Sequence, residues 1–332
     1  MPMFARLVFA IAVLMVVSVS VRAETKEVRI TKQPGLLYLP MILMEAGGLI
    51  EKHTKAAGLG DVKTTWVTFN SGGAATDALL SGNVDFVTSG ASNMLLLWDR
   101  TKGQVKGVAA CGGMPMYLVT RNPAIKSLKD FTEKDKIAVP TIKVSSQATM
   151  LQMAAEKEFG PGQHGKLDSI TIQLGHPDAT LSLLSPISEI NSHFSLPPYQ
   201  NIALKDPGVH KVLSSIDVFG GPVNNAIVFA AAKFHDANPK IVGAVIAAMT
   251  EAMQMIKNEP KRAIEIYLGQ VKEKLSAEEL IELLKEPGVV FDVAPVGMQK
   301  FATFMAKVGT LKTAPTSWKD FFFAEAHSLP GN

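Results

Sequence analysis

A helix–strand unit that occurs twice is the strongest constraint on the fold of this chain. Residues 75–81 (ATDALLS) match residues 179–185 (ATLSLLS), and a turn and an alternating stretch follow each copy, at 84–89 and 190–195. A chance match is the alternative, because short apolar helices look alike. As a true repeat, the pattern predicts two α/β lobes of similar build.

Short strands and helices also alternate elsewhere in the chain. Such alternation is typical of a parallel sheet with helices on its faces. Period-two alternation predicts strands at residues 28–30, 63–69, 84–88, 137–140, 170–174 and 190–195, and apolar periodicity predicts helices at 41–55, 74–81, 148–159 and 179–185. After Asn238, a predicted N-cap followed by Pro239, the chain reads as almost wholly helical, with a capping box at 276–279.

The N-terminus has the pattern of a secretory signal peptide. Arg6 precedes an apolar stretch at 7–21, and Val21 and Ala23 occupy the −3 and −1 positions of a cleavage site. An uncleaved anchor is the alternative, but about fifteen apolar residues is short for the ~20 that a spanning helix needs. No cysteine for a lipid anchor follows this stretch. We therefore expect residues 1–23 to be removed and the protein to be soluble in the periplasm.

Charge and cysteine content argue against several functional classes. Removal of Arg6 and Arg22 leaves 31 basic and 30 acidic side chains, and no basic run of the kind that binds nucleic acid is present. Cys111 is the single cysteine, which excludes an intrachain disulfide and a cysteine zinc cage. Nucleophile-elbow, phosphate-loop, dinucleotide and zinc-protease motifs are missing. We expect a protein that is not an enzyme and that holds no metal or cofactor.

Two serines mark the ends of the repeated units. Parallel α/β sheets bind ligands beyond the carboxyl ends of their strands, so two facing lobes would aim Ser89 and Ser195 into one cleft. The stretch 189–199 (EINSHFSLPPY) alternates until two prolines end it. This predicts that residues 193–195 point at a ligand. The alternative is that His193 is a hydrogen-bonded core residue; His176 is interpreted as a loop residue that orients its turn.

Small hydroxyl and glycine residues precede two predicted helices. Residues 71–73 (SGG) and 145–147 (SSQ) would leave the first backbone N–H groups of these helices open to a ligand oxygen. The helix dipole adds partial positive charge there, which suits a sulfonate, carboxylate or nitrate. The alternative is that the serines only cap their helices.

Four segments carry a resemblance to a known family: GLLYLPMILMEAGGLI (35–50), FNSGGAATDALLSGNVD (69–85), INSHFSLPPY (190–199) and VNNAIVFA (223–230). In their order and spacing, the chain resembles the periplasmic solute-binding proteins of ABC importers in the nitrate/sulfonate/taurine class, which share their build with thiamine-pyrimidine-precursor binders. The resemblance implies a two-lobed, type II binding protein with parallel-rich α/β lobes and a helical C-terminal part. Residues 24–112 and 225–332 would form lobe one and 113–224 lobe two, joined by crossing segments at 112–119 and 220–229.

The resemblance also implies which residues line the cleft. These are Gln33, Tyr38, Ser71, Gly72, Gly73, Ser89, Gly90, Ala91, Ser92, Met114, Ser145, Ser146, Gln147, His193, Phe194, Ser195 and Asn224. The chain departs from the family where relatives have a glycine before the lobe-two strand and this sequence has Pro186-Ile187-Ser188. No arginine falls on an expected cleft position, so a hydrophobic sulfonate or a neutral heterocycle is an alternative ligand.

The function implied is capture of a small anionic organic solute, such as a sulfonate, taurine or nitrate. The monomeric protein would close about its crossing segments and deliver the solute to an ABC permease and its ATPase. An enzyme like the thiamine-pyrimidine synthases is the first alternative, although those enzymes carry a cysteine-rich motif that this chain lacks and are not exported. A ligand sensor without transport is the second.

Overall fold

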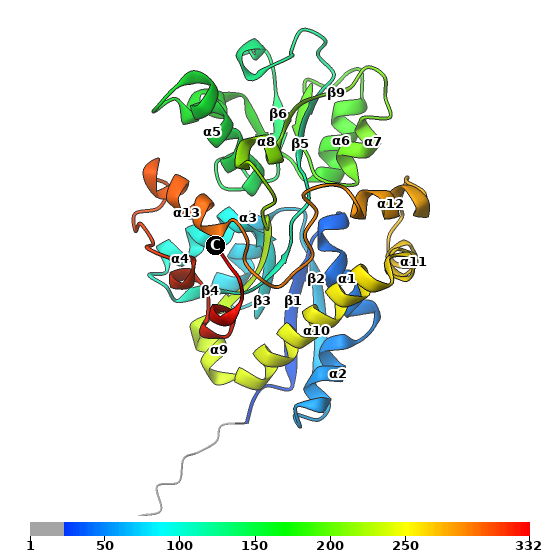
Figure 1. Ribbon diagram of the computed structural model, residues 1–332, viewed down its shortest axis with the longest axis vertical. Helices are drawn as coiled ribbons and strands as arrows, with labels where there is room; N and C mark the ends of the chain where they lie inside the picture. Colours follow the sequence, from blue (N-terminus) through cyan, green and yellow to red (C-terminus); the bar gives the residue numbers. More distant parts are fainter. Residues whose placement is uncertain (1–22) are drawn as a thin grey trace, which may run out of the picture.

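Each lobe of the protein is built on one five-stranded sheet (Figure 1). The computed structural model describes residues 23–332; the predicted signal peptide, but for Ala23, lies outside the described residues. The first sheet has the order β2-β1-β3-β10-β4 and the second the order β7-β6-β8-β5-β9. Their strands are β1 (Glu27–Lys32), β2 (Lys63–Thr68), β3 (Phe86–Gly90), β4 (Val105–Gly112) and β10 (Ala226–Ala231), and β5 (Tyr117–Thr120), β6 (Ile137–Val139), β7 (Thr171–Gln173), β8 (Ser192–Phe194) and β9 (His210–Ser214).

The two sheets correspond strand by strand, and this explains the repeat in the sequence. The unit of α3 (Gly72–Leu80) and β3 in lobe one has the same place in its sheet as α6 (His176–Leu184) and β8 in lobe two. In both lobes the repeated strand is the central one and runs parallel to its neighbour, β1 or β6. The prediction of two lobes of similar build is confirmed.

One strand in each sheet runs against the others, so the sheets are mixed and not purely parallel. β10 is antiparallel to β3 and β4, and β5 is antiparallel to β8 and β9. Both reversed strands directly follow a passage of the chain from one lobe to the other. A chain that arrives from the other lobe enters at the carboxyl ends of the parallel strands and must run back through the sheet.

The helices cover both faces of each sheet, with the C-terminal helices packed mainly on lobe one (Figure 1). The helix predicted at 41–55 is two helices, because Gly48 adopts a left-handed conformation (φ 55°) that ends the first. The remaining α-helices are α1 (Leu39–Ala46), α2 (Leu49–Ala56), α4 (Ala91–Arg100), α5 (Ser146–Phe159), α7 (Tyr199–Ala203), α8 (Ser215–Phe219), α9 (Ala232–Ala237), α10 (Pro239–Asn258), α11 (Pro260–Gln270), α12 (Ala277–Leu284) and α13 (Met298–Lys307). Of the described helices, none is both long enough and apolar enough to cross a membrane.

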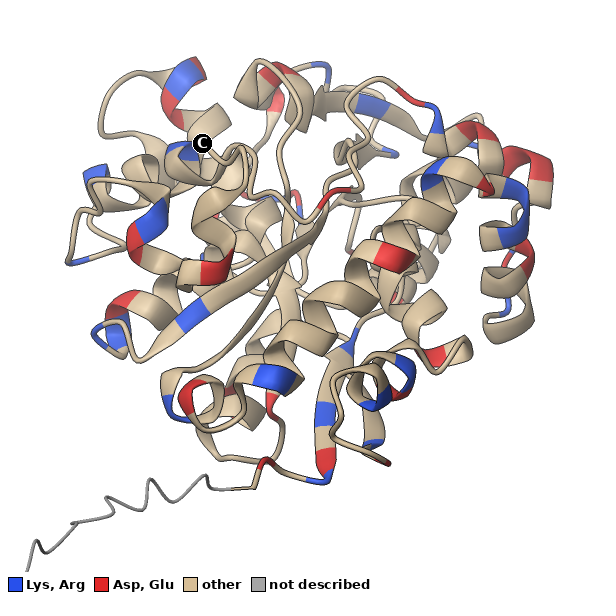
Figure 2. Ribbon diagram, turned by 60° about the horizontal axis from the view of Figure 1, so that its bottom comes forward, with Lys and Arg blue, Asp and Glu red and all other residues tan. Residues whose placement is uncertain are grey.

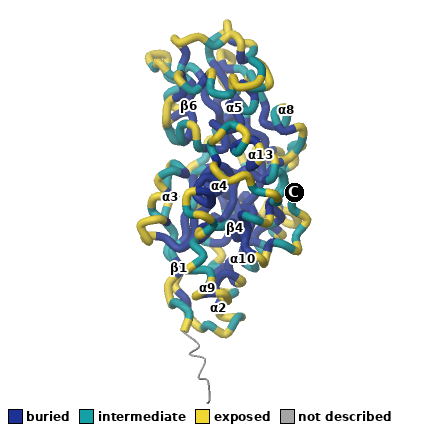
Figure 3. The backbone as a smooth tube through the Cα atoms, turned by 90° about the vertical axis from the view of Figure 1, so that its left-hand side faces the viewer, coloured by how far each residue is buried: buried dark blue, intermediate teal, exposed yellow. Residues whose placement is uncertain are grey.

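Two short segments, 113–116 and 220–225, join the lobes, and a third segment lies against both of them. Within this third segment, residues 286–297, Val290 exchanges two backbone hydrogen bonds with Gly113 (2.7 and 2.8 Å). Val296 accepts from the backbone of Asn224 at 2.9 Å and donates to its side-chain oxygen at 2.7 Å. We call residues 286–297 the strap. Buried backbone runs through both lobes and the region where they meet (Figure 3).

The division of the chain into lobes that the sequence implied remains our proposal for its domains. The strands of the first sheet lie within 24–112 and 225–332, and those of the second lie within 113–224. The crossing segments are narrower than the predicted ranges, because parts of 112–119 and 220–229 belong to β4, β5 and β10.

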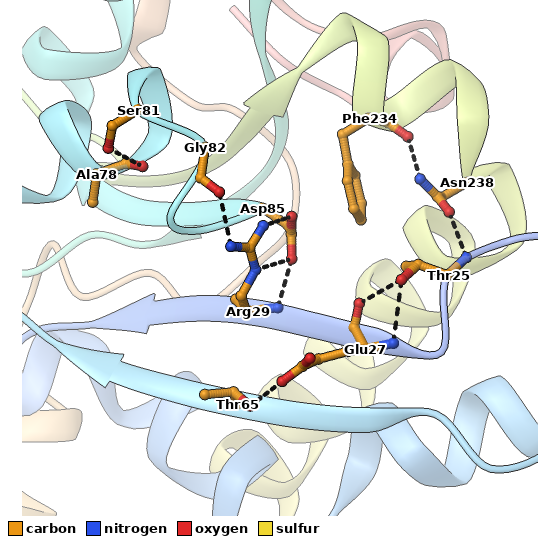
Figure 4. Close-up of polar contacts among 10 residues, drawn as sticks. All are labelled: Thr25, Glu27, Arg29, Thr65, Ala78, Ser81, Gly82, Asp85, Phe234 and Asn238. Atoms are coloured by element: carbon orange, nitrogen blue, oxygen red, sulfur yellow. Dashed lines mark hydrogen bonds and ion pairs between the residues drawn. The ribbon is translucent and has the colours of Figure 1, made fainter.

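At the end of lobe one that lies away from lobe two, polar contacts join β1 to neighbouring segments (Figure 4). Arg29 donates to both carboxylate oxygens of Asp85 at 2.7 and 3.1 Å, which ties β1 to the turn before β3. Asn238 does not cap α10 as predicted, since its side chain accepts from the backbone of Thr25 and donates to Phe234. The carboxylate of Glu24 takes that role and accepts from Lys240 and Ile241 at the start of α10.

This contact predicts that Glu24 stabilises the fold. In a Glu24→Ala variant two N–H groups of α10 lose their acceptor, which should lower the free energy of unfolding by about 1 kcal/mol. For a chain of this size, the midpoint of thermal unfolding should then fall by roughly 1–2 °C. Glu133→Ala, at an exposed position without a helix to cap, is the control. Equal midpoints for the two variants would contradict the role of Glu24.

Candidate functional site

The two lobes enclose a small cavity where they meet. Its walls are Gln33, Tyr38, Gly72, Ser89, Gly90, Asn93, Met116, Pro140, Ser145, Ser146, Gln147, His176 and Asn225. Its volume of about 20 Å³ is little more than the ~10–15 Å³ that one water molecule needs. The lobes lie close together in this structure, and the cavity has no room for a solute larger than water.

The wall from lobe one carries buried polar atoms without partners. Ser89 and Gly90 end β3, and the side chains of Ser89 and Asn93 are buried. Ser89 Oγ and Asn93 Nδ2 form no hydrogen bond within the described chain. The first residue of α3 must be small here, because a Cβ atom on Gly72 would lie 2.1 Å from Ser89 Oγ. Unpartnered buried polar atoms of this kind are uncommon and are expected where a ligand supplies the missing partner.

The wall from lobe two is formed by the first turns of α5 and α6. Ser145 caps α5 by accepting from the backbone of Ala148 at 3.2 Å. Ser146 donates instead to the carbonyl oxygen of Asn225 at 3.2 Å, which joins lobe two to the second crossing segment. The capping interpretation is thus correct for Ser71 and Ser145. Ser145, Ser146 and Gln147 also line the cavity, and binding of a ligand oxygen at these helix starts stays a prediction.

Gln147 begins a buried chain of three side chains that leads away from the cavity. Its Nε2 atom lies 3.0 Å from Nε2 of His176, and Nδ1 of His176 lies 2.9 Å from Nε2 of His193. Burial lowers the pKa of His176 to about 3. Burial, followed by the neighbouring His176, holds the pKa of His193 well below its usual value. Both rings are therefore neutral near pH 7.

The field in the cavity comes from backbone dipoles. The N-termini of α3, α4, α5 and α6 all lie at its walls, with Gly72, Gly90, Ser146 and His176 at or next to the first residues. None of the lining residues is Lys, Arg, Asp or Glu. Charged residues of both signs are instead scattered along the helices and loops of the chain (Figure 2). Burial raises the pKa of Tyr38, so its phenol stays protonated. Four positive helix ends without a counter-ion suit a bound anion.

Fewer than half of the residues expected at the cleft lie at the cavity. They are Gln33, Tyr38, Gly72, Ser89, Gly90, Ser145, Ser146 and Gln147. The others lie outside its lining: Ser71, Gly73, Ala91, Ser92, Met114, His193, Phe194, Ser195 and Asn224. Among these, Met114 and Phe194 are core side chains, and Asn224 bonds to the strap.

The stretch 189–199 does not point at the cavity through its histidine. His193 is fully buried behind His176, and Ser195 Oγ makes only a 3.5 Å contact with the carbonyl oxygen of Leu196. The stretch meets lobe one through Pro197, whose carbonyl oxygen accepts from the backbone of Leu36 at 3.0 Å. The side chains of β8 lie behind the residues that line the cavity, because β8 is the central strand of its sheet and α6 covers it.

The sequence reasoning missed Asn93, Met116, Pro140, His176 and Asn225. His176 was interpreted as a turn residue, but it is the first residue of α6. The repeat offered a signal, since matching 179–185 to 75–81 places His176 opposite Gly72, which was expected at the cleft. The crossing segments that contain Met116 and Asn225 were recognised in the sequence. The residues predicted there were Met114 and Asn224, which lie two positions and one position before the lining residues.

Comparison with known proteins identifies the fold of this chain. No family model matches the chain, and no curated protein matches it by sequence. Solved structures do match, among them the alkanesulfonate-binding protein SsuA from Xanthomonas axonopodis pv. citri bound to MOPS. The two have a TM-score of 0.67 and 16% identity over 88% of this chain and 96% of that one. The chain has the periplasmic binding protein fold.

Two further binding proteins of this fold are similar over most of their length. The aliphatic sulphonate-binding protein SsuA from Escherichia coli matches with a TM-score of 0.62 and 19% identity, over 90% of this chain and 99% of that chain. The nitrate-binding protein NrtA from Synechocystis PCC 6803 matches with a TM-score of 0.67 and 15% identity, over 88% and 83%. The expected fold class is thus confirmed: the structural neighbours are binding proteins of the class that the sequence resembles.

The buried histidines predict how the stability of this binding-protein fold depends on pH. Above pH 6.5 both rings are neutral in the folded and the unfolded chain, so they add no pH dependence. As the pH falls from 6.5 towards the folded pKa, which is about 3 for His176, only the unfolded chain takes up their protons. The free energy of unfolding should then fall by about 2 kcal/mol per histidine between pH 7 and pH 5.

Chemical denaturation at the two pH values measures this loss. His176→Gln and His193→Gln should each make the loss of stability between pH 7 and pH 5 smaller by about 2 kcal/mol. Gln254→Asn, at an exposed amide of α10 that does not titrate, is the control and should leave the loss unchanged. An equal loss of stability in all three variants would contradict burial of neutral histidines.

Proposed function

We propose that the protein is the extracytoplasmic solute-binding component of an ABC importer and captures a small anionic organic solute between its lobes. The observation that carries this proposal is the cavity at four helix N-termini, where Ser89 and Asn93 keep buried polar atoms without partners. The ligand class is a sulfonate, taurine included, or nitrate.

The absence of charge among the lining side chains supports a monoanion with delocalised charge. Each helix N-terminus presents about half a positive charge together with free N–H donors. Hydroxyl and amide side chains such as Ser89, Asn93 and Gln147 add donors that need no counter-ion. The lining contains no cationic side chain to balance a second negative charge. The similar SsuA and NrtA structures are a sulfonate-binding and a nitrate-binding protein, which supports the same class here.

Closure of the lobes is the proposed mechanism of capture. A solute that touches Ser89 in lobe one and Gln147 in lobe two favours the closed state by its greater affinity for that state. The crossing segments 113–116 and 220–225 would bend, and the strap would restrict the bending because it bonds to both.

The cellular context is also proposed. Residues 1–23 would be a signal peptide cleaved after Ala23, and the protein would act as a soluble monomer in the periplasm. Its partners would be an ABC permease and the associated ATPase, which take up the captured solute. The periplasmic proteins of the same fold support this placement.

Titration calorimetry with methanesulfonate, taurine and nitrate tests the proposed ligand class. Gly72→Ala should abolish binding, because its Cβ would occupy the space beside Ser89 Oγ. Ser89→Ala should weaken binding about 5- to 150-fold, which corresponds to ~1–3 kcal/mol for an unpaired buried group. Gly243→Ala, whose Cβ would meet open space, is the matched control.

Small-angle scattering tests the closure step in the same samples. Saturating ligand should reduce the radius of gyration of the wild-type protein and of Gly243→Ala, but not of Gly72→Ala. The proposed function is wrong if none of the three anions binds, and the closure mechanism is wrong if an anion binds without reducing the radius.

A further inference from the structure

The buried chain Gln147–His176–His193 can exist in two hydrogen-bonding directions. A neutral imidazole has one N–H and one bare nitrogen, so each ring must donate on one side and accept on the other. An amide can turn either its oxygen or its nitrogen towards a neighbour, because the two ends have nearly the same shape. Fixing the direction at one member therefore fixes it at the other two.

In the first direction, the amide nitrogen of Gln147 donates to Nε2 of His176 across the 3.0 Å contact. His176 must then carry its proton on Nδ1 and donate to Nε2 of His193 across 2.9 Å. The proton of His193 is left on Nδ1, which is buried and has no partner within the described chain. Buried N–H groups without an acceptor are rare, because such a group has lost its hydrogen bond to water and gained none in return.

In the second direction, the amide oxygen of Gln147 accepts from Nε2 of His176. His176 then accepts at Nδ1 from Nε2 of His193, and Nδ1 of His193 keeps only a lone pair. No buried N–H is left over at the histidines. The amide nitrogen of Gln147 now points away from His176, and Gln147 is a lining residue of the cavity.

We infer that the chain adopts the second direction, so that His193 and His176 orient the amide of Gln147 with its NH₂ group towards the ligand. This inference deepens the proposed function and rests on it for the ligand, but the tautomers themselves do not depend on it. His193 is a positioning residue: it does not line the cavity and acts through His176 and Gln147.

The orientation makes the site selective for head groups that only accept hydrogen bonds. A sulfonate or nitrate oxygen accepts from the NH₂ group of Gln147. A sulfonamide has an NH₂ group in place of one acceptor oxygen, and a pose that sets this NH₂ group against Gln147 would require the amide to turn. Turning it reverses both histidines and leaves the N–H of His193 buried without a partner.

Nitrogen-15 NMR of histidine-labelled protein tests the tautomers directly. In the ligand-free wild-type protein near pH 7, the rings of His176 and His193 should each show a protonated Nε2 and a bare Nδ1. Spectra of His176→Gln and His193→Gln assign the two signals among the seven histidines of the chain. A protonated Nδ1 on either ring overturns the inference, whether or not any anion binds.

Ligand selectivity tests the consequence at the cavity. Wild-type protein should prefer methanesulfonate over methanesulfonamide. His193→Met should narrow this preference about 5- to 150-fold, because its thioether has no N–H to leave unpaired and can accept from Nδ1 of His176 when the chain turns. Gln147→Glu still accepts from His176 but presents an oxygen to the ligand, so it should keep the Nε2 tautomer of His176 and lose methanesulfonate affinity at least tenfold.

An unchanged preference in His193→Met would overturn the positioning role of His193. If the wild-type protein shows both Nε2 tautomers but binds none of the anions, the direction of the chain stands and the proposed function is wrong. The two failures are therefore distinguishable.

Discussion

The passage of the backbone between the lobes is the constraint on which the rest of the structure depends. Two crossing segments and the strap meet at one place, and Gly113 is packed so closely that a Cβ on it would lie 2.0 Å from the carbonyl oxygen of Val223. Because the chain leaves and enters each lobe there, β5 and β10 run against their neighbours. The carboxyl ends of the parallel strands in both lobes consequently face the same junction, which is where the cavity lies.

The cavity combines strong backbone dipoles with neutral side chains. Helix N-termini provide the positive field, and Ser89, Asn93 and Gln147 provide hydrogen-bonding groups whose protonation does not change near neutral pH. The histidines behind Gln147 stay neutral because they are buried. Such a site suits the proposed anion, which directed hydrogen bonds would hold once closure of the lobes had removed competing water.

The local elements could be predicted from the sequence because their causes are local. The alternation in 63–69 and 137–140, the caps at Ser71 and Ser145, and the capping box at 276–279 involve neighbours in the chain. Asn238 shows the limit of such reasoning. It has the residue type of an N-cap, but a distant segment supplies Glu24 as the acceptor, and the side chain of Asn238 is free to bond to Thr25.

By itself, the sequence determined the two similar lobes, because the repeat at 75–81 and 179–185 records the same packing of a helix on a central strand in each. It also determined that glycine and small polar residues stand at the starts of α3 and α5. Only the tertiary structure decided which side chains line the cavity. His176 and His193 are both close to the junction, but whether each lines the cavity or lies behind its wall depends on how α6 covers β8. How deep each histidine lies is set by packing between segments that are far apart in the chain, and no local sequence pattern encodes such packing.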